Sequence, residues 1–115
     1  MRIKEKSMKK FNPAYVLLKD MYEDDYYPAF LVDKVRDELI SVIELLESGE
    51  TDIERIQDSL DRAVEGINDL QDEFDAHDSE IETVARESIG ESVTYILSWF
   101  GIGIDSEEAI RARDW

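Results

Sequence analysis

Two pairs of carboxylates have the residue types and the spacing of a site for a divalent cation. Glu44 and Glu47 are separated by two residues, and so are Asp69 and Asp72. Carboxylate oxygens are the ligands that Mg²⁺ and Mn²⁺ prefer, and such an ion can activate water or polarise a phosphoryl group. The same pattern also arises by chance here, because 29 residues of the chain are Asp or Glu.

The expected helical register argues against this cation site. A metal site in a helical bundle needs carboxylates that project inward. Glu44 lies nearly opposite the apolar stripe of its helix, and Asp69 and Asp72 lie opposite Ile67 and Leu70. We therefore expect no catalytic residues. A metal-dependent hydrolase with Mg²⁺ or Mn²⁺, of the all-α nucleotide pyrophosphohydrolase type, is kept as the alternative.

Residues 22–27 suggest recognition of another protein instead. The segment interleaves aromatic and acidic side chains, namely Tyr22, Glu23, Asp24, Asp25, Tyr26 and Tyr27. Rigid aromatic area beside negative charge suits a partner that carries Arg or Lys side chains. The same tyrosines can instead anchor the chain onto a bundle, with their hydroxyls at its rim. The segment lacks the D-x-D-x-D-G pattern of a calcium loop.

A second candidate surface runs along a helix expected from residue 51 to residue 74. Six acidic side chains share the face opposite its apolar stripe: Glu54, Asp58, Asp61, Glu65, Asp69 and Asp72. Ordered negative charge speeds association with a basic protein and aids specificity. We therefore expect a non-enzymatic protein-binding module with a basic partner, in the manner of an immunity protein, antitoxin or inhibitor. The plainer alternative is a solvated face that only keeps the protein soluble.

The charge of the chain is large and uneven. Its formal net charge is -16, yet residues 1–11 contain five basic residues against one acidic residue, a net charge of +4 that leaves −20 for the rest. A body this negative is repelled by the phosphates of nucleic acids and by anionic membranes. We expect neither as a partner, and the protein itself to be a monomer or a homodimer.

Cysteine and histidine usage narrows the chemistry further. The absence of cysteine excludes disulfides, thiolate catalysis and Cys-based zinc sites, and His77 is the only histidine. No apolar run approaches the roughly 20 residues of a membrane span, and no apolar segment follows the basic N-terminus as it would in a secretory signal. We expect a cytoplasmic protein and, without a motif that places a serine near His77, no triad chemistry.

The apolar periodicity predicts an all-α protein. We expect a mobile basic tail over residues 1–11 and a single helical domain over residues 12–115. The domain should be a compact bundle of three long amphipathic helices plus short N- and C-terminal helices. The expected ranges are 13–21, 28–47, 51–74, a helix that follows a capping box at 79–82 and ends before Gly101, and 106–112.

The third and fourth helices show the pattern most clearly. Each follows a Ser/Thr-x-x-Glu capping box, Thr51 to Glu54 and Ser79 to Glu82. Their apolar stripes are expected to be buried; they comprise Ile53, Ile56, Leu60, Ala63, Ile67, Leu70 and Phe74, then Ile81, Val84, Ala85, Ile89, Val93, Ile96 and Phe100. Trp115 should pack back onto the bundle, and Arg111 and Arg113 should pair with nearby acids.

Three segments resemble a family of uncharacterised small acidic bacterial proteins, a domain of unknown function. They are residues 21–35 (MYEDDYYPAFLVDKV), residues 79–87 (SEIETVARE) and the closing residues 113–115 (RDW). The resemblance covers most of the chain outside the basic tail. It implies a single intracellular helical domain and supplies no catalytic residues.

Overall fold

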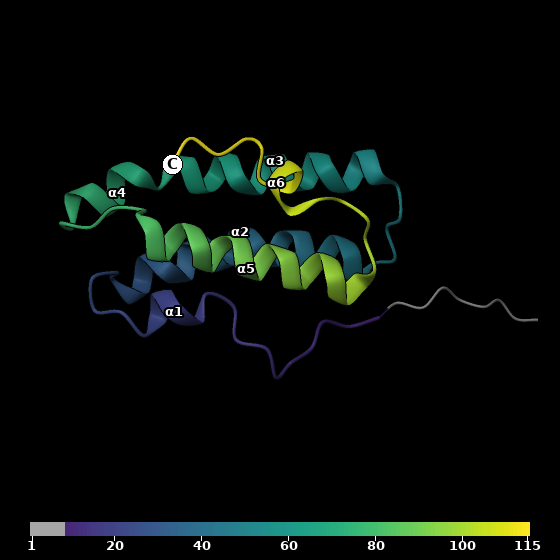
Figure 1. Cartoon of the computed structure of the whole chain (residues 1–115), viewed down its shortest axis with the longest axis horizontal. Coiled ribbons are helices and arrows are strands. Elements are labelled where there is room, and N and C mark those ends of the chain that lie inside the picture. Colours follow the sequence, from purple (N-terminus) through teal and green to yellow (C-terminus); the bar gives the residue numbers. More distant parts are fainter. Residues whose placement is uncertain (1–8) are drawn as a thin grey trace, which may run out of the picture.

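The part of the chain that the structure describes contains six helices. The computed structural model describes residues 9–115, so the first eight positions of the expected basic tail lie outside the described residues. The helices are α1 (Lys19–Tyr22), α2 (Ala29–Glu47), α3 (Ile53–Asp69), α4 (Gln71–Ala76), α5 (Thr83–Phe100) and α6 (Ser106–Ala109) (Figure 1). Residues 9–115 contain no strand, which confirms the all-α prediction.

The long helices α2, α3 and α5 bury the apolar stripes that the sequence predicts. On α2 the buried side chains are Leu31, Val32, Val35, Leu39, Val42, Ile43 and Leu46; on α5 they include Ala85, Ile89, Val93, Ile96 and Leu97. Two members of the predicted stripes are nevertheless exposed, Ile53 at the start of α3 and Val84 at the start of α5. Both lie in the first turns of their helices.

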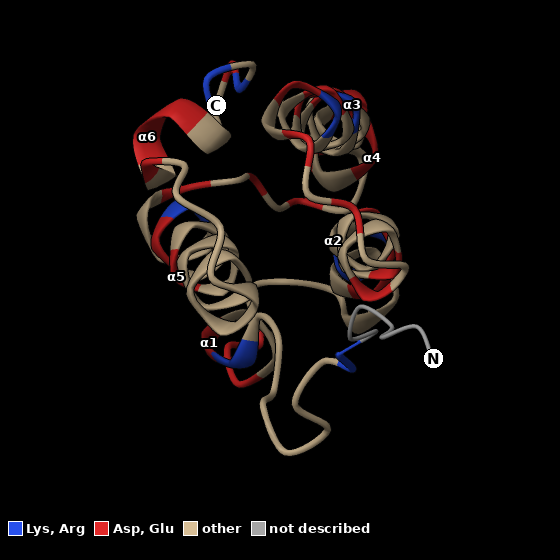
Figure 2. Ribbon diagram, turned by 90° about the vertical axis from the view of Figure 1, so that its right-hand side faces the viewer, with Lys and Arg blue, Asp and Glu red and all other residues tan. Residues whose placement is uncertain are grey.

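Seen end-on, the fold has four corners (Figure 2). Three of them are α2, α3 and α5, and the fourth holds α6 with the C-terminal segment. The packing follows the four edges of this square, because α2 contacts α3 and α5, and α6 contacts α3 and α5. A four-residue helix therefore stands where a four-helix bundle would have a long one, and it leaves part of α3 uncovered.

The N-terminal segment corrects the helix expected over residues 13–21. The helix is α1 alone, and the chain before it is non-helical. Leu18 adopts a left-handed backbone conformation with φ 59 and donates its N–H to Ser92 Oγ at 3.0 Å. The amide of Phe11 donates to a Glu47 carboxylate oxygen at 2.8 Å. The bond of Leu18 to Ser92 of α5 thus replaces an expected intrahelical one, and the bond of Phe11 to Glu47 of α2 holds the chain before it.

The helix expected over residues 51–74 is two helices. α3 ends at Asp69, Leu70 lies between them, and α4 carries Phe74 into the core. The predicted capping boxes are also wrong. Asp52, not Thr51, caps α3 through its bond from the Glu54 amide at 2.9 Å, and α5 begins four residues after the expected cap Ser79, which is buried.

One asparagine of α3 binds the C-terminal segment at two points. Asn68 Nδ2 donates to the Ala112 carbonyl at 2.9 Å, and the Asp114 amide donates to Asn68 Oδ1 at 3.1 Å. α6 ends at Ala109 rather than at residue 112, since the chain turns there to lie along α3. Trp115 packs against the core as expected.

None of the helices in residues 9–115 has the length and apolar character that crossing a membrane requires.

Candidate binding groove between the third and sixth helices

The uncovered part of α3 forms one wall of a groove. The hollow measures about 720 Å³ and is lined by Ile53, Glu54, Gln57, Asp58, Gly103, Ile104, Asp105, Glu108 and Arg111. Its first four residues come from the first two turns of α3, and the others come from α6 and the segments directly before and after it. The groove exists because α6 is too short to cover the start of α3, and Ile53 accordingly remains 48% exposed.

Negative charge dominates the lining of this groove. It contains four carboxylates, Glu54, Asp58, Asp105 and Glu108, against the single guanidinium of Arg111, a net charge of −3. Asp105 also caps α6, because its carboxylate accepts the Glu107 amide at 3.0 Å. Ile53 and Ile104 add apolar area between the charges. Carboxylates beside apolar area suit a long cationic side chain, whose methylene stem can pack while its head is paired.

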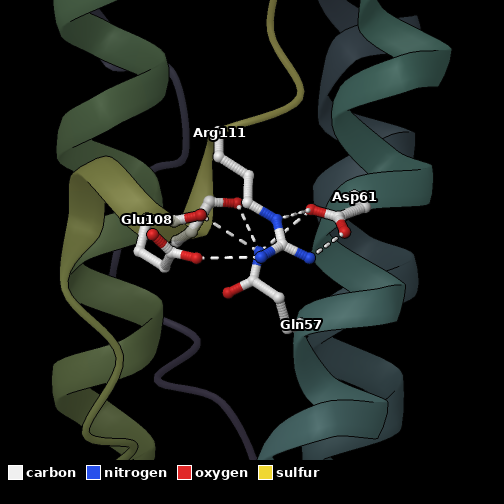
Figure 3. Close-up of polar contacts among 5 residues, drawn as sticks. Gln57, Asp61, Glu108 and Arg111 are labelled. Carbon is white, nitrogen blue, oxygen red and sulfur yellow. Dashed lines mark hydrogen bonds and ion pairs between the residues drawn. The ribbon is translucent and has the colours of Figure 1, made fainter.

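Arg111 is already paired with acids on both sides (Figure 3). Its Nη2 lies 2.8 Å from Asp61 Oδ2 and its Nε 3.2 Å from Asp61 Oδ1, while its Nη1 lies 2.8 Å from Glu108 Oε2. This fork-shaped contact holds the C-terminal segment against α3. The guanidinium also lowers the pKa of Asp61, helped by the amide of Gln57. The expected pairing of Arg111 is confirmed, as is that of Arg113 with Glu107 at 3.3 Å.

The acidic face expected on the third helix is divided by this contact. Glu54, Asp58, Glu65, Asp69 and Asp72 are exposed, whereas Asp61 is half-buried and neutralised by Arg111. Glu54 and Asp58 line the groove, and Glu65 and Asp69 lie on the same helix beyond Asp61. Asp72 belongs to α4. The groove therefore takes in only part of the predicted stripe.

The tyrosine segment is attached to the bundle rather than free. Tyr27 is buried, and its hydroxyl accepts the amide of Ala85 at 3.2 Å. Tyr22 donates to Asp33, and burial together with this bond raises the pKa of Tyr22 to about 12. The acids of the segment differ in exposure, since Asp24 accepts the Tyr26 amide at 2.9 Å and is half-buried, while Glu23 and Asp25 are exposed.

Tyr22 and Tyr26 still present part of their rings to solvent. The hydroxyl of Tyr26 lies 3.5 Å from a Glu82 carboxylate oxygen, at the start of α5. Each of these two tyrosines thus makes one contact through its hydroxyl, and the recognition role of the segment stays a prediction.

The residues of the metal-site alternative are not brought together. Glu47 accepts a hydrogen bond from the Phe11 amide, and Glu44 is exposed. The charge of Asp69 instead acts on another α2 carboxylate, Glu38, where it contributes to a raised pKa. Within residues 9–115, no group of three or more His, Asp or Glu side chains is placed to hold an ion.

His77 occupies the C-cap of α4. Its Nδ1 lies 3.0 Å from the carbonyl oxygen of Glu73, and its ring contacts that of Phe30. The Glu73 carboxylate pairs with Lys34 at 2.8 Å. The histidine therefore lies at the end of α4 and joins it to Phe30 of α2.

Comparison with known proteins places the chain in one family. A model of the family of unknown function DUF5713 matches residues 11–115. The chain belongs to this family. The match agrees with the resemblance to a domain of unknown function that residues 21–35, 79–87 and 113–115 carry. No curated protein and no solved structure matches the chain.

Gln57 is the groove residue that the sequence did not single out. It lies beside the apolar stripe of α3, where a glutamine usually marks the edge of a buried face, yet it is only 8% exposed. Its side-chain contacts include the carbonyls of Glu108 and Ala109, which are distant in the sequence. No local spacing could have revealed this pairing.

Proposed function

We propose that this chain is a non-enzymatic protein-binding module whose groove between α3 and α6 takes a basic segment of a partner protein. The observation that carries the proposal is the lining of the groove, with four carboxylates around Ile53 and Ile104 and a single guanidinium that is already paired. A role like that of an immunity protein, antitoxin or inhibitor suits such a surface, because opposite charge speeds encounter and disfavours wrong partners.

The groove should be a better receptor than the rest of the acidic surface for a physical reason. Exposed carboxylates on an open helix face are fully hydrated and are screened by salt. In the groove they lie beside apolar side chains and face one another across two elements, so a cation is contacted from more than one side. Such converging contacts make a localised site.

The test is the binding of an octapeptide of alternating arginine and lysine, measured by isothermal titration calorimetry at low and moderate salt. Glu54→Gln with Asp58→Asn should weaken binding about tenfold, equivalent to about 1.4 kcal/mol. The matched control is Glu65→Gln with Asp69→Asn, which removes the same charge from the same helix outside the groove. It should weaken binding about twofold at most, through the loss of long-range attraction.

Equal losses in the two double variants would show that the peptide follows net charge alone, and the proposal would then be wrong. The absence of any binding by the parent protein would also reject it. Binding should fall steeply as salt increases in every variant that retains affinity, because the contacts are electrostatic.

A further inference from the structure

The amide of Gln57, on the α3 wall of the groove, is held in one orientation. Its Nε2 donates to Asp61 Oδ1 at 3.0 Å, to the Glu108 carbonyl at 3.1 Å, and lies 3.4 Å from the Ala109 carbonyl. All three neighbours can only accept hydrogen bonds, so the donor end of the amide must face them. The side chain cannot exchange its nitrogen and oxygen ends without losing all three contacts.

The other end of this amide is open to solvent. Gln57 is only 8% exposed and lines the groove, and no described residue from 9 to 115 donates a hydrogen bond to its Oε1, which water can reach. A carbonyl oxygen fixed in this way is a ready acceptor, and leaving it unpaired once a ligand covers it would be costly. A ligand that covers this oxygen should therefore donate a hydrogen bond to it.

The charges around Gln57 Oε1 determine which kind of hydrogen-bond donor fits there. Glu54 and Asp58 stand on the same wall as Gln57, and Glu108 stands on the opposite wall, so the donor should be a cation. A guanidinium carries five N–H groups in a rigid plane and can donate to a neutral oxygen and a carboxylate at once. An ammonium is compact and strongly hydrated, and it lacks this planar arrangement.

We propose that the groove is a receptor for an arginine side chain, which donates to Gln57 Oε1 and to the carboxylates of Glu54 or Asp58. The methylene stem of the arginine packs between Ile53 and Ile104. This inference rests on the proposed function and names the residue that the basic segment must present. Arg111 stays in its own pair with Asp61 and Glu108, and that pair keeps the amide of Gln57 in place (Figure 3).

The test compares three octapeptides in which glycine alternates with arginine, with lysine, or with citrulline, the neutral analogue of arginine. Each is titrated into the labelled full chain and followed by NMR at the side-chain amide of Gln57 and the methyl groups of Ile53 and Ile104. The arginine peptide should shift all three signals and bind about tenfold more tightly than the lysine peptide. The citrulline peptide should leave them unchanged, since it lacks the charge.

A variant supplies an independent readout. Gln57→Met removes the acceptor while keeping the length of the side chain, and it should abolish the preference for arginine over lysine. Because this change also removes the contacts to Asp61 and Glu108, its fold is checked from the amide spectrum. The peptide series on the parent chain decides the matter whether or not this variant folds.

The outcomes separate the two proposals. If lysine and arginine peptides bind the groove equally and the Gln57 amide does not shift, the arginine receptor is wrong while the acidic groove remains a binding site. If the alternating arginine–lysine peptide fails to depend on Glu54 and Asp58, the proposed function itself fails.

Discussion

Two carboxylates of this fold experience opposite environments. Asp61 accepts from the guanidinium of Arg111 and from Gln57, and these bonds lower its pKa. Glu38 is partly buried on α2, and desolvation, together with the charges of Asp37 and Asp69, raises its pKa. The first carboxylate stabilises the fold when it is ionised, and the second is tolerated there at a cost.

The two should therefore respond oppositely to substitution and pH. Ionised Asp61 contributes stability that is present above its unfolded pKa of about 3.9 and is lost as pH falls through the lower folded value. Asp61→Asn should lower the free energy of unfolding at pH 7, with the loss shrinking as the parent itself becomes protonated. For Glu38 the folded state binds the proton more tightly, so stability is lost as pH rises above the ordinary value of about 4.3.

Glu38→Gln should consequently raise the free energy of unfolding at pH 7, and the gain should disappear below about pH 4. Urea unfolding of the parent and both variants between pH 7 and about pH 3 measures these differences. Effects of the same sign at neutral pH would contradict the assigned environments.

Gly66 explains why Glu38 is where it is. A Cβ at this position of α3 would clash with the carboxylate of Glu38, so the glycine makes room for that side chain. Gly66→Ala should therefore gain less than the roughly 1 kcal/mol that alanine usually adds in a helix. The missing gain should return in a Glu38→Ala background, where nothing occupies that space. A double-mutant cycle by urea unfolding measures the coupling.

Gly90 provides the matched control for this prediction. It lies within α5, and a Cβ there would meet nothing within 4 Å. Gly90→Ala should raise the free energy of unfolding by about 1 kcal/mol, with or without Glu38. A full gain from Gly66→Ala alone would show that Glu38 moves aside freely.

The sequence predicts those helices whose stripe and ends are set by neighbouring residues. α2 was predicted from residue 28 to 47 and runs from Ala29 to Glu47, because its stripe is continuous and its start and end carry Pro28 and Gly49. The prediction of a helix over residues 13–21 is wrong, since only Lys19–Tyr22 is helical there. A hydrogen bond from Leu18 to Ser92 on α5, invisible in the local pattern, outweighs the helical preference of that segment.

The groove was partly predictable for the same reason. The shared face of Glu54 and Asp58 follows from helical spacing and was predicted. The contact of Asp61 with Arg111 and the orientation of Gln57 depend on where α6 docks, and that position is set by elements far apart in the sequence. Sequence periodicity therefore finds which side of α3 is acidic, and only the packing reveals which part of it is hollow.

The docking of the C-terminal segment should depend on Asn68. Asn68→Ala removes its bonds to Ala112 and Asp114, and the free energy of unfolding should fall by about 2 kcal/mol. Hydrogen exchange should quicken in residues 105–115 while α2 and α5 stay protected. Asn68→Asp retains an acceptor for Asp114 and should be intermediate. Exchange that quickens equally everywhere would contradict a local fastening.

The whole molecule combines a small apolar core with a large excess of negative charge. α6 and the C-terminal segment close the fourth corner. The ion pair of Arg111 with Asp61 and the hydrogen bonds of Gln57 and Asn68 hold them against α3. A longer helix at this corner would bury Ile53 and cover the groove. The groove thus exists because α6 is short. It is acidic because the whole chain has an excess of acidic residues.

Salt should therefore stabilise the fold while weakening the binding that we propose. Increasing sodium chloride from about 0.1 M to about 1 M shortens the screening length from about 10 Å to about 3 Å and relieves the repulsion among carboxylates. The melting temperature at pH 7 should rise by about 5 °C, the shift that about 1 kcal/mol produces in a domain of this size. Over the same range, the affinity for the arginine–lysine peptide should fall.

The control is the same salt series near pH 4, where carboxylates are partly protonated and the rise in melting temperature should shrink. A melting temperature that falls with salt at pH 7 would mean that the few ion pairs outweigh the repulsion of the excess acids. A rise of equal size at both pH values would trace the effect to apolar burial, which concentrated salt also strengthens. The carboxylates cause both effects if salt raises the melting temperature and lowers the peptide affinity at pH 7, and if both changes are smaller at pH 4.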